Sequence, residues 1–223
     1  MNITNEKVTA YINGLYQPLN PFLESLRQEA ENNAIPIILR ETETLLLTLL
    51  EIKNPLRILE IGTAVGYSAL CFAISKPSSY ITTLELQERL VKTAAVNFEK
   101  AGVKDRIQII QGEALDTLLK LEDNLKAGKL DSFDFVFIDG AKGHYLEMWD
   151  HCIKLCKPGA VIVSDNILFK AMTASDLYLD HRRNKTIVNR MRGYLRYITS
   201  LPGVVSTVLP VGDGVAISVI GEM

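Results

Sequence analysis

Cysteine is scarce in this sequence, with three among 223 residues. So sparse and odd a set excludes a disulfide scaffold and is typical of a reducing cytoplasm. Long apolar runs are missing as well, because LLLTLL at 45–50 falls far short of the ~20 residues that span a membrane. The first residues, MNITNEKVTA, lack the basic start and apolar core of a signal peptide. We therefore expect a cytoplasmic protein.

An excess of positive charge is also absent. Lys and Arg number 24 against 26 Asp and Glu, a net charge of −2. This balance excludes a generally basic nucleic-acid protein but leaves a local basic patch open. The composition, 48% hydrophobic and 22% charged, is that of an ordinary globular chain. We predict one domain over 1–223, made of an N-terminal helical extension (1–52) and an α/β core (54–223).

From Asn54 onward, short apolar runs alternate with helical patterns, and the first 52 residues are helical in pattern. Such alternation predicts a mostly parallel sheet with helices on both faces. The two last runs flank a glycine-containing turn and predict an antiparallel hairpin. We also expect helices over 144–159 and along the stretch from Asp165 to Ser200. The expected strands are 56–61, 79–86, 107–110, 133–139, 160–165, 204–210 and 214–221.

A glycine-containing turn, LEIGTAVGYSA (59–69), connects the first expected strand to a helix. Any α/β protein can use such a turn, so alone it is weak evidence of a ligand site. It lacks the GK(S/T) of a phosphate loop. Ala64 also takes the place of the second glycine in the dinucleotide pattern GxGxxG, so a pyrophosphate ligand is not indicated.

Two acidic positions sharpen the interpretation of this turn. Glu85 ends the second expected strand, 25 residues after Glu60, where a carboxylate can accept hydrogen bonds from two ribose hydroxyls. The segment QGEALD (111–116) follows the third strand, where an adenine would lie. A ligand with an adenosine but no pyrophosphate is expected, and S-adenosylmethionine (AdoMet) fits that description.

Oxygen-bearing side chains follow the next two strands. Asp139 ends the fourth strand in FIDGAKGHY (137–145), and Asp165 and Asn166 follow the fifth in VSDNILF (163–169). Each aspartate alone is explained as well by capping of the next helix. Together, at the ends of neighbouring strands, two carboxylates and an amide suit a hard cation such as Mg²⁺.

These motifs resemble the class I, metal-dependent AdoMet O-methyltransferases, the family of catechol and caffeoyl-CoA O-methyltransferases, from about Pro36 onward. The sequence departs from that family at ILRETE (38–43), where a Met-Glu-Pro-Glu-like stretch is usual. The resemblance implies a Rossmann-like α/β fold with a mostly parallel seven-stranded sheet, an antiparallel C-terminal hairpin and extra N-terminal helices. It implies Asp139, Asp165 and Asn166 as metal ligands, with Asp139 and Lys142 catalytic and Lys142 as general base. The implied AdoMet contacts are Ile38, Glu60, Gly62, Thr63, Gly66, Tyr67, Ser68, Glu85, Leu86, Glu113, Ala114 and Asp139.

A basic segment at 181–197 bears on the substrate, with six Lys or Arg and no acidic residue. Most such runs are solvated helix faces, but this one follows the metal ligands and can form a phosphate-binding rim. Within the family, AVGYSALCFA, FIDGAKGHY, SDNILFK and PVGDGVAIS look most like bacterial enzymes that methylate tRNA 5-hydroxyuridine at the wobble position. That likeness implies 5-methoxyuridine as product, a homodimer, and RNA contacts from Lys170, Arg182, Arg183 and Arg190.

Two alternatives remain open at this point. One keeps the reaction but uses a small catechol or caffeoyl-CoA-like phenol as substrate. The other is a non-catalytic AdoMet-binding protein, which is expected to lack metal ligands that this sequence retains.

Overall fold

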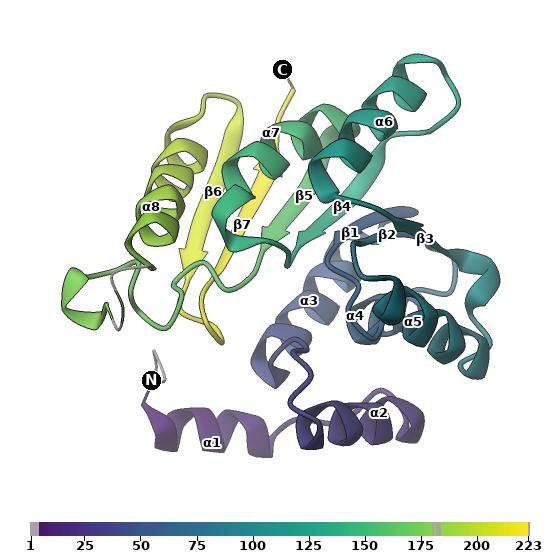
Figure 1. Cartoon of the computed structure of the whole chain (residues 1–223), viewed down its shortest axis with the longest axis horizontal. Coiled ribbons are helices and arrows are strands. Elements are labelled where there is room, and N and C mark those ends of the chain that lie inside the picture. Colours follow the sequence, from purple (N-terminus) through teal and green to yellow (C-terminus); the bar gives the residue numbers. More distant parts are fainter. Residues whose placement is uncertain (1–4, 180, 182–183, 223) are drawn as a thin grey trace.

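The computed structural model describes residues 5–179, 181 and 184–222. Its centre is a twisted seven-stranded sheet with strand order β3-β2-β1-β4-β5-β7-β6 (Figure 1). The first five strands are parallel, and β7 runs antiparallel to both β5 and β6. The predicted fold class, including the C-terminal hairpin, is thereby confirmed. The strands are β1 (Arg57–Ile61), β2 (Tyr80–Glu85), β3 (Ile107–Gln111), β4 (Phe133–Ile138), β5 (Cys156–Ser164), β6 (Val204–Leu209) and β7 (Val215–Ile220).

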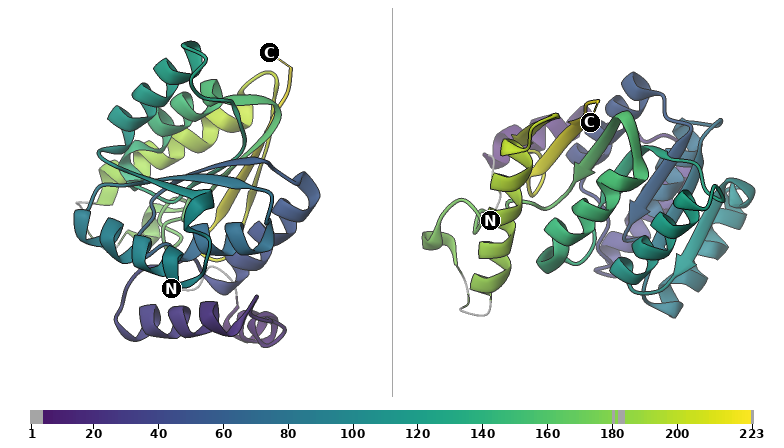
Figure 2. Two further views of the ribbon diagram at one scale, coloured as in Figure 1. Left: turned by 90° about the vertical axis from the view of Figure 1, so that its right-hand side faces the viewer. Right: turned by 90° about the horizontal axis from the view of Figure 1, so that it is seen from above.

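Helices cover both faces of the sheet (Figure 2). One apolar cluster joins α2, α3, α4 and α5 to one face, and a second joins α6, α7 and α8 to the other. Neighbouring residues of β4 alternate between these clusters, as the two-residue period of a strand requires. The helices are α1 (Glu6–Gly14), α2 (Pro21–Asn32), α3 (Arg40–Lys53), α4 (Tyr67–Ser75), α5 (Glu88–Lys100), α6 (Ala114–Lys126), α7 (Tyr145–Leu155) and α8 (Lys185–Ser200), with the 3₁₀ turns η1 (Lys104–Arg106), η2 (Lys142–His144) and η3 (Asp176–Tyr178).

The N-terminal helices differ in how firmly they join the core. Asn20 caps α2 by accepting a 2.8 Å hydrogen bond from the N–H of Leu23, and Pro21 occupies the first turn. Leu23 and Leu26 of α2 belong to the same apolar cluster as α4. Helix α1, in contrast, buries no residue. Within the described residues, no helix is both long and apolar enough to cross a membrane.

Two predicted helices were placed wrongly. The predicted helix over 144–159 stops at Leu155, and the next strand starts at Cys156, because Pro158 and Gly159 cannot continue a helix. The stretch after Asp165 forms turns before α8 begins at Lys185. Residues 169–171 there all have positive φ angles, which a right-handed helix does not allow.

Candidate functional site

Loops from neighbouring strands meet at the carboxyl edge of the sheet. The N–H of Asp139 donates to the carbonyl of Ile61 (2.9 Å), and the N–H of Asp165 donates to that of Ile138 (3.0 Å). The ladder between parallel strands therefore continues into the loops and fixes the two aspartates side by side, as strand adjacency predicts.

The glycines of the turn at 62–66 allow other parts of the protein to pack closely against the turn. A Cβ at Gly62 (φ +103°) would clash with the carbonyl oxygen of Asp139. A Cβ at Gly66 (φ +85°), the N-cap of α4, would lie 2.5 Å from the ring of Phe98. Both positions need glycine for conformation and for close packing. The turn therefore packs directly against the Asp139 loop and α5.

Two glutamates support this turn in different ways. Glu60 is fully buried and accepts hydrogen bonds from the hydroxyls of Ser68 and Thr83. Burial raises the pKa of the Glu60 carboxyl to about 8. Glu85 is partly exposed and accepts from the N–H groups of Ala64 (3.0 Å) and Gln87 (2.9 Å). Glu85 is the one that borders open space, at the end of β2.

A cleft of about 470 Å³ opens at this edge, next to the turn. Six of the predicted AdoMet contacts line it, namely Gly62, Glu85, Leu86, Glu113, Ala114 and Asp139. The other six do not, namely Ile38, Glu60, Thr63, Gly66, Tyr67 and Ser68. The lining also includes residues that were not among the predicted contacts. Gly112, Gly140 and Ala141 lie within the quoted motifs, whereas Pro36, Ile37, Gln87 and Leu90 lie outside them.

Glu113 serves a second purpose at the rim of this cleft. As the N-cap of α6 it accepts hydrogen bonds from the N–H groups of Leu115 (2.7 Å) and Asp116 (3.2 Å). Its carboxylate pairs these two donors and interacts favourably with the positive end of the helix dipole. Glu113 therefore stabilises the start of α6 at the edge of the cleft.

Asn166 joins the predicted metal ligands. Its side-chain amide donates to Asp139 Oδ1 (3.0 Å), and its backbone N–H donates to Asp165 Oδ1 (2.7 Å). The amide oxygen accepts from Lys142 Nζ (3.2 Å). Asn166 has φ +59°, a conformation that asparagine tolerates better than most residues. The four residues predicted from separate motifs thus form one cluster.

Burial and mutual repulsion act on the two aspartates. Burial raises the pKa of Asp139 to about 6, although Lys142 and Asn166 act to lower it. The pKa of Asp165 is raised first by burial and then by the charge of Asp139. A buried carboxylate and a half-buried one that repel each other, with an amide oxygen beside them, suit a small divalent cation. The described residues contain no cluster of three His, Cys, Asp or Glu for a metal, so the amide is needed to complete this set.

Lys142 has two neighbours that sequence patterns did not indicate. Its Nζ lies 4.0 Å from Asp213 Oδ2 and 5.1 Å from the centre of the Phe169 ring. Asp213 was predicted only as part of a hairpin turn. Nothing in that turn's sequence shows that strand order brings it to the end of β5, where it also accepts from the N–H of Lys170 (2.6 Å).

Among its described residues, the basic segment offers a hydrogen bond to the loop that carries Lys142. Arg190 of α8 donates to the carbonyl of Gly143 (3.1 Å) and is otherwise exposed. Lys170 is exposed on the adjacent loop. Arg192 instead pairs with Asp176 (2.6 Å) and caps the 172–173 turn. The predicted RNA contacts Arg182 and Arg183 lie outside the described residues.

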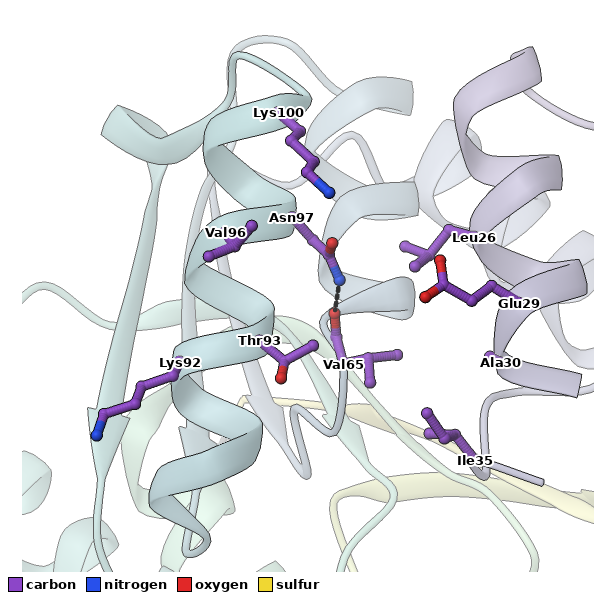
Figure 3. Close-up of a pocket in the computed structure, with 10 residues that line it drawn as sticks. All are labelled: Leu26, Glu29, Ala30, Ile35, Val65, Lys92, Thr93, Val96, Asn97 and Lys100. Atoms are coloured by element: carbon purple, nitrogen blue, oxygen red, sulfur yellow. Dashed lines mark hydrogen bonds between the residues drawn. The ribbon is translucent and has the colours of Figure 1, made fainter. Parts of the chain in front are cut away.

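A second cavity, of about 360 Å³, lies between α2 and α5 (Figure 3). Val65 of the glycine turn and Ile35 form part of its wall, and Asn97 donates to the carbonyl of Val65 (2.9 Å). None of the predicted catalytic or metal-binding residues lines it.

Comparison with known proteins gives consistent matches. The sequence model of a family described as O-methyltransferase matches residues 15–219. A catechol O-methyltransferase of Niastella koreensis is 32% identical over 79% of this chain and 77% of its own. Caffeoyl-CoA O-methyltransferase 1 of Eucalyptus globulus is 31% identical over 76% of this chain and 68% of its own. Two other curated relatives match over about half of their lengths, 51% and 48%.

Solved structures agree with these sequence matches. The crystal structure of an O-methyltransferase from Bacillus cereus in complex with SAH superposes with a TM-score of 0.82. That protein is 28% identical, and the match covers 96% of this chain and 97% of the other.

Proposed function

This chain belongs to the O-methyltransferase family, and we propose that it transfers the methyl group of AdoMet to an acidic hydroxyl with a divalent cation as cofactor. The observation that carries the proposal is one continuous site. Asp139 lines the nucleoside-sized cleft and also forms part of the Asp139–Asp165–Asn166 cluster. Methyl donor and acceptor would therefore meet at one residue.

AdoMet fits the cleft in size and chemistry. Cavities of ~300–1,000 Å³ suit ligands of this kind, and the cleft of about 470 Å³ lies within that range. Glu85 offers carboxylate oxygens to the ribose, while Leu86, Leu90 and Ile37 offer apolar surface to the adenine. SAH, bound in the Bacillus cereus relative, is what remains of AdoMet after methyl transfer.

The residues present also fit a cation. Asp139, Asp165 and the amide oxygen of Asn166 would hold Mg²⁺ or a similar ion, and water would complete the coordination. A cation there supplies positive charge that lowers the pKa of a nearby hydroxyl. Asn166 would have to exchange its bonds to Asp139 and Lys142 for that role.

We assign the proton transfer to Lys142. When uncharged, Lys142 can accept the hydroxyl proton at Nζ, and the oxygen then attacks the sulfonium methyl. The new O–CH₃ bond forms as the S–CH₃ bond breaks and leaves neutral SAH. Asp213 and Phe169 fix the position of the Lys142 side chain, which matters because reacting atoms must be held ~3–3.5 Å apart.

For the substrate we propose 5-hydroxyuridine at the wobble position of tRNA, with 5-methoxyuridine as product. Its hydroxyl is enolic and has O4 beside it, so it presents two adjacent oxygens as a catechol does. The supporting feature is Arg190, which is exposed on α8 and contacts the loop of Lys142. Arg190 and Lys170 offer positive charge to phosphates flanking an unstacked base.

A small phenol is the second candidate. The observation in its favour is that relatives matching most of this chain are named for catechol and for caffeoyl-CoA. The same Arg190 and Lys170 would then bind the phosphates of a coenzyme A thioester.

Parallel methyl-transfer assays distinguish the two candidate substrates. Purified protein, AdoMet and Mg²⁺ are incubated with tRNA from cells lacking this protein, with catechol, or with caffeoyl-CoA. Nucleoside mass spectrometry and chromatography then identify the methylated product. We expect 5-methoxyuridine from the tRNA. Methylated phenol with unmodified tRNA would instead favour the second candidate.

A further inference from the structure

The chain between α2 and α3 forms one wall of the AdoMet cleft. Pro36 and Ile37 line the cleft, while their neighbour Ile35 lines the second cavity (Figure 3). A single extended segment therefore separates two open spaces. Ile35 and Ile37 pack against the apolar core cluster, and Ile38 is buried within it.

Backbone hydrogen bonds hold this segment at its ends alone. The N–H of Ile35 donates to the carbonyl of Ala30 (2.9 Å). At the other end, the carbonyl of Ile38 accepts from Arg27 Nη2 (3.0 Å). Among the described residues, this is the one hydrogen bond that reaches the backbone of 36–38. Arg27 therefore adds a directed hydrogen bond to the apolar packing that holds this wall.

Arg27 is itself held on several sides. The side chain is 1% exposed, and its Nη2 also donates to Glu43 Oε2 (2.6 Å). Its Nε donates to the hydroxyl of Tyr67 (3.1 Å), which in turn donates to Glu43 (2.8 Å). Tyr67 is the first residue of α4, directly after the glycine turn. One guanidinium therefore ties the wall to the residue that follows the glycine turn, whose Gly62 and Ala64 line the same cleft.

We infer that Arg27 is a positioning residue for AdoMet, which sets the affinity for the cofactor by holding Pro36 and Ile37 against it. This inference rests on the proposed function. Arginine suits the task because its planar guanidinium donates in fixed directions to four acceptors, the fourth being Glu31 (3.2 Å), which a lysine ammonium cannot reproduce. The Tyr67 and Ile38 predicted as AdoMet contacts act through Arg27 in this account, since neither lines the cleft.

Isothermal titration of SAH into the full chain tests the inference. Arg27→Lys keeps the charge beside Glu43 but loses the fork, so we expect the Kd for SAH to rise about tenfold. In AdoMet titrations with the substrate found above, KM should rise similarly while kcat is retained. A merely structural role would instead reduce the number of binding sites and kcat, and leave Kd and KM unchanged.

Two controls separate the tether from general stability. Glu43→Gln weakens the buried ion pair but keeps the bond from Arg27 to Ile38, so its Kd should stay within about twofold of the wild type. Asp134→Asn removes a carboxylate that binds Lys157 and two backbone N–H groups near the amino ends of β1 and β4. It should lower the melting temperature without changing the Kd.

Each result decides the inference. Equal affinities of wild type and Arg27→Lys for SAH would overturn it, as would equal losses in Arg27→Lys and Glu43→Gln. If Arg27→Lys does not fold, the uncharged pair Arg27→Met with Glu43→Gln removes the tether without leaving a buried charge, and the same rise in Kd is expected. Absence of SAH binding by the wild type would overturn the proposed function and this inference together.

Discussion

Glu60 makes the stability of the fold depend on pH while it supports the glycine turn. Its carboxyl group is fully buried at the end of β1, where hydroxyls of Ser68 and Thr83 face it. Burial disfavours the charged form, so the folded protein holds a proton that the unfolded chain gives up near its ordinary pKa of 4.5. The group supports the glycine turn from behind, since Glu60 does not line the cleft.

A dependence of stability on pH follows from Glu60. Because its pKa is raised to about 8 by burial, its contribution is complete below pH 4.5 and is lost as pH rises toward 8. The loss is at most about 1.4 kcal/mol per pH unit. We expect Glu60→Gln to flatten this decline, measured by urea unfolding at pH 5, 6.5 and 8. Identical slopes for variant and wild type would contradict the assigned cause.

Asp165 is expected to lower the stability of the fold while it serves catalysis as a metal ligand. It is 2% exposed and repels Asp139, so without a cation the pair weakens the fold. We expect Asp165→Asn to leave thermal stability unchanged or higher when EDTA is present. Loss of a metal ligand should lower methyl transfer by about 100-fold or more, while SAH binding by titration survives. Retained activity would remove Asp165 from the metal site.

At the scale of elements, α8 is placed beside the chemistry by the order of the strands. It packs on α7 and β6, and Arg190 projects toward the η2 loop. In Figure 1, α8 lies beside the β6 edge of the sheet and α6 lies toward the other edge, on the same face. Exposed basic residues near these two helices, Arg190 on α8 and Lys129 after α6, can therefore be compared for their effect on RNA binding.

Charge reversal on α8 tests its role in RNA binding. Arg190→Glu should weaken tRNA binding several-fold and reduce the salt dependence of the affinity, because a phosphate contact releases counterions. Lys129→Glu, an equal change of charge at an exposed position after α6, is the matched control and should have little effect. Filter binding between 50 and 200 mM salt provides the readout. Equal losses in both variants would mean a non-specific charge effect.

The sequence predicted these elements unevenly, for physical reasons. Apolar runs located the strands, because this signal is local. The helix expected after Asp165 is interrupted by three residues of positive φ at 169–171, which no local pattern shows. Likewise Asp213 and Arg27 act through partners 71 and 16 residues away, respectively Lys142 and Glu43. Contacts that depend on tertiary packing were missed.

For the whole molecule, α1 indicates an assembly. Val8, Tyr11 and Ile12 of α1 and Leu15, which follows the helix, are 46–70% exposed. This is a large apolar surface for a helix to leave uncovered. We predict that this face contributes to a homodimer, which sedimentation velocity at micromolar concentration would detect. Tyr11→Glu should shift the protein toward the monomer. A wild type that sediments as a monomer would contradict the prediction.

The central claim is that cofactor cleft and acidic cluster form one metal-dependent methyl-transfer site. The most direct test supplies methyl-labelled AdoMet and Mg²⁺ with tRNA, catechol and caffeoyl-CoA in parallel, with and without EDTA. The account predicts label on a hydroxyl oxygen, as 5-methoxyuridine in the tRNA, and loss of that label with EDTA. Transfer that persists in EDTA, or no transfer to any hydroxyl, would contradict it.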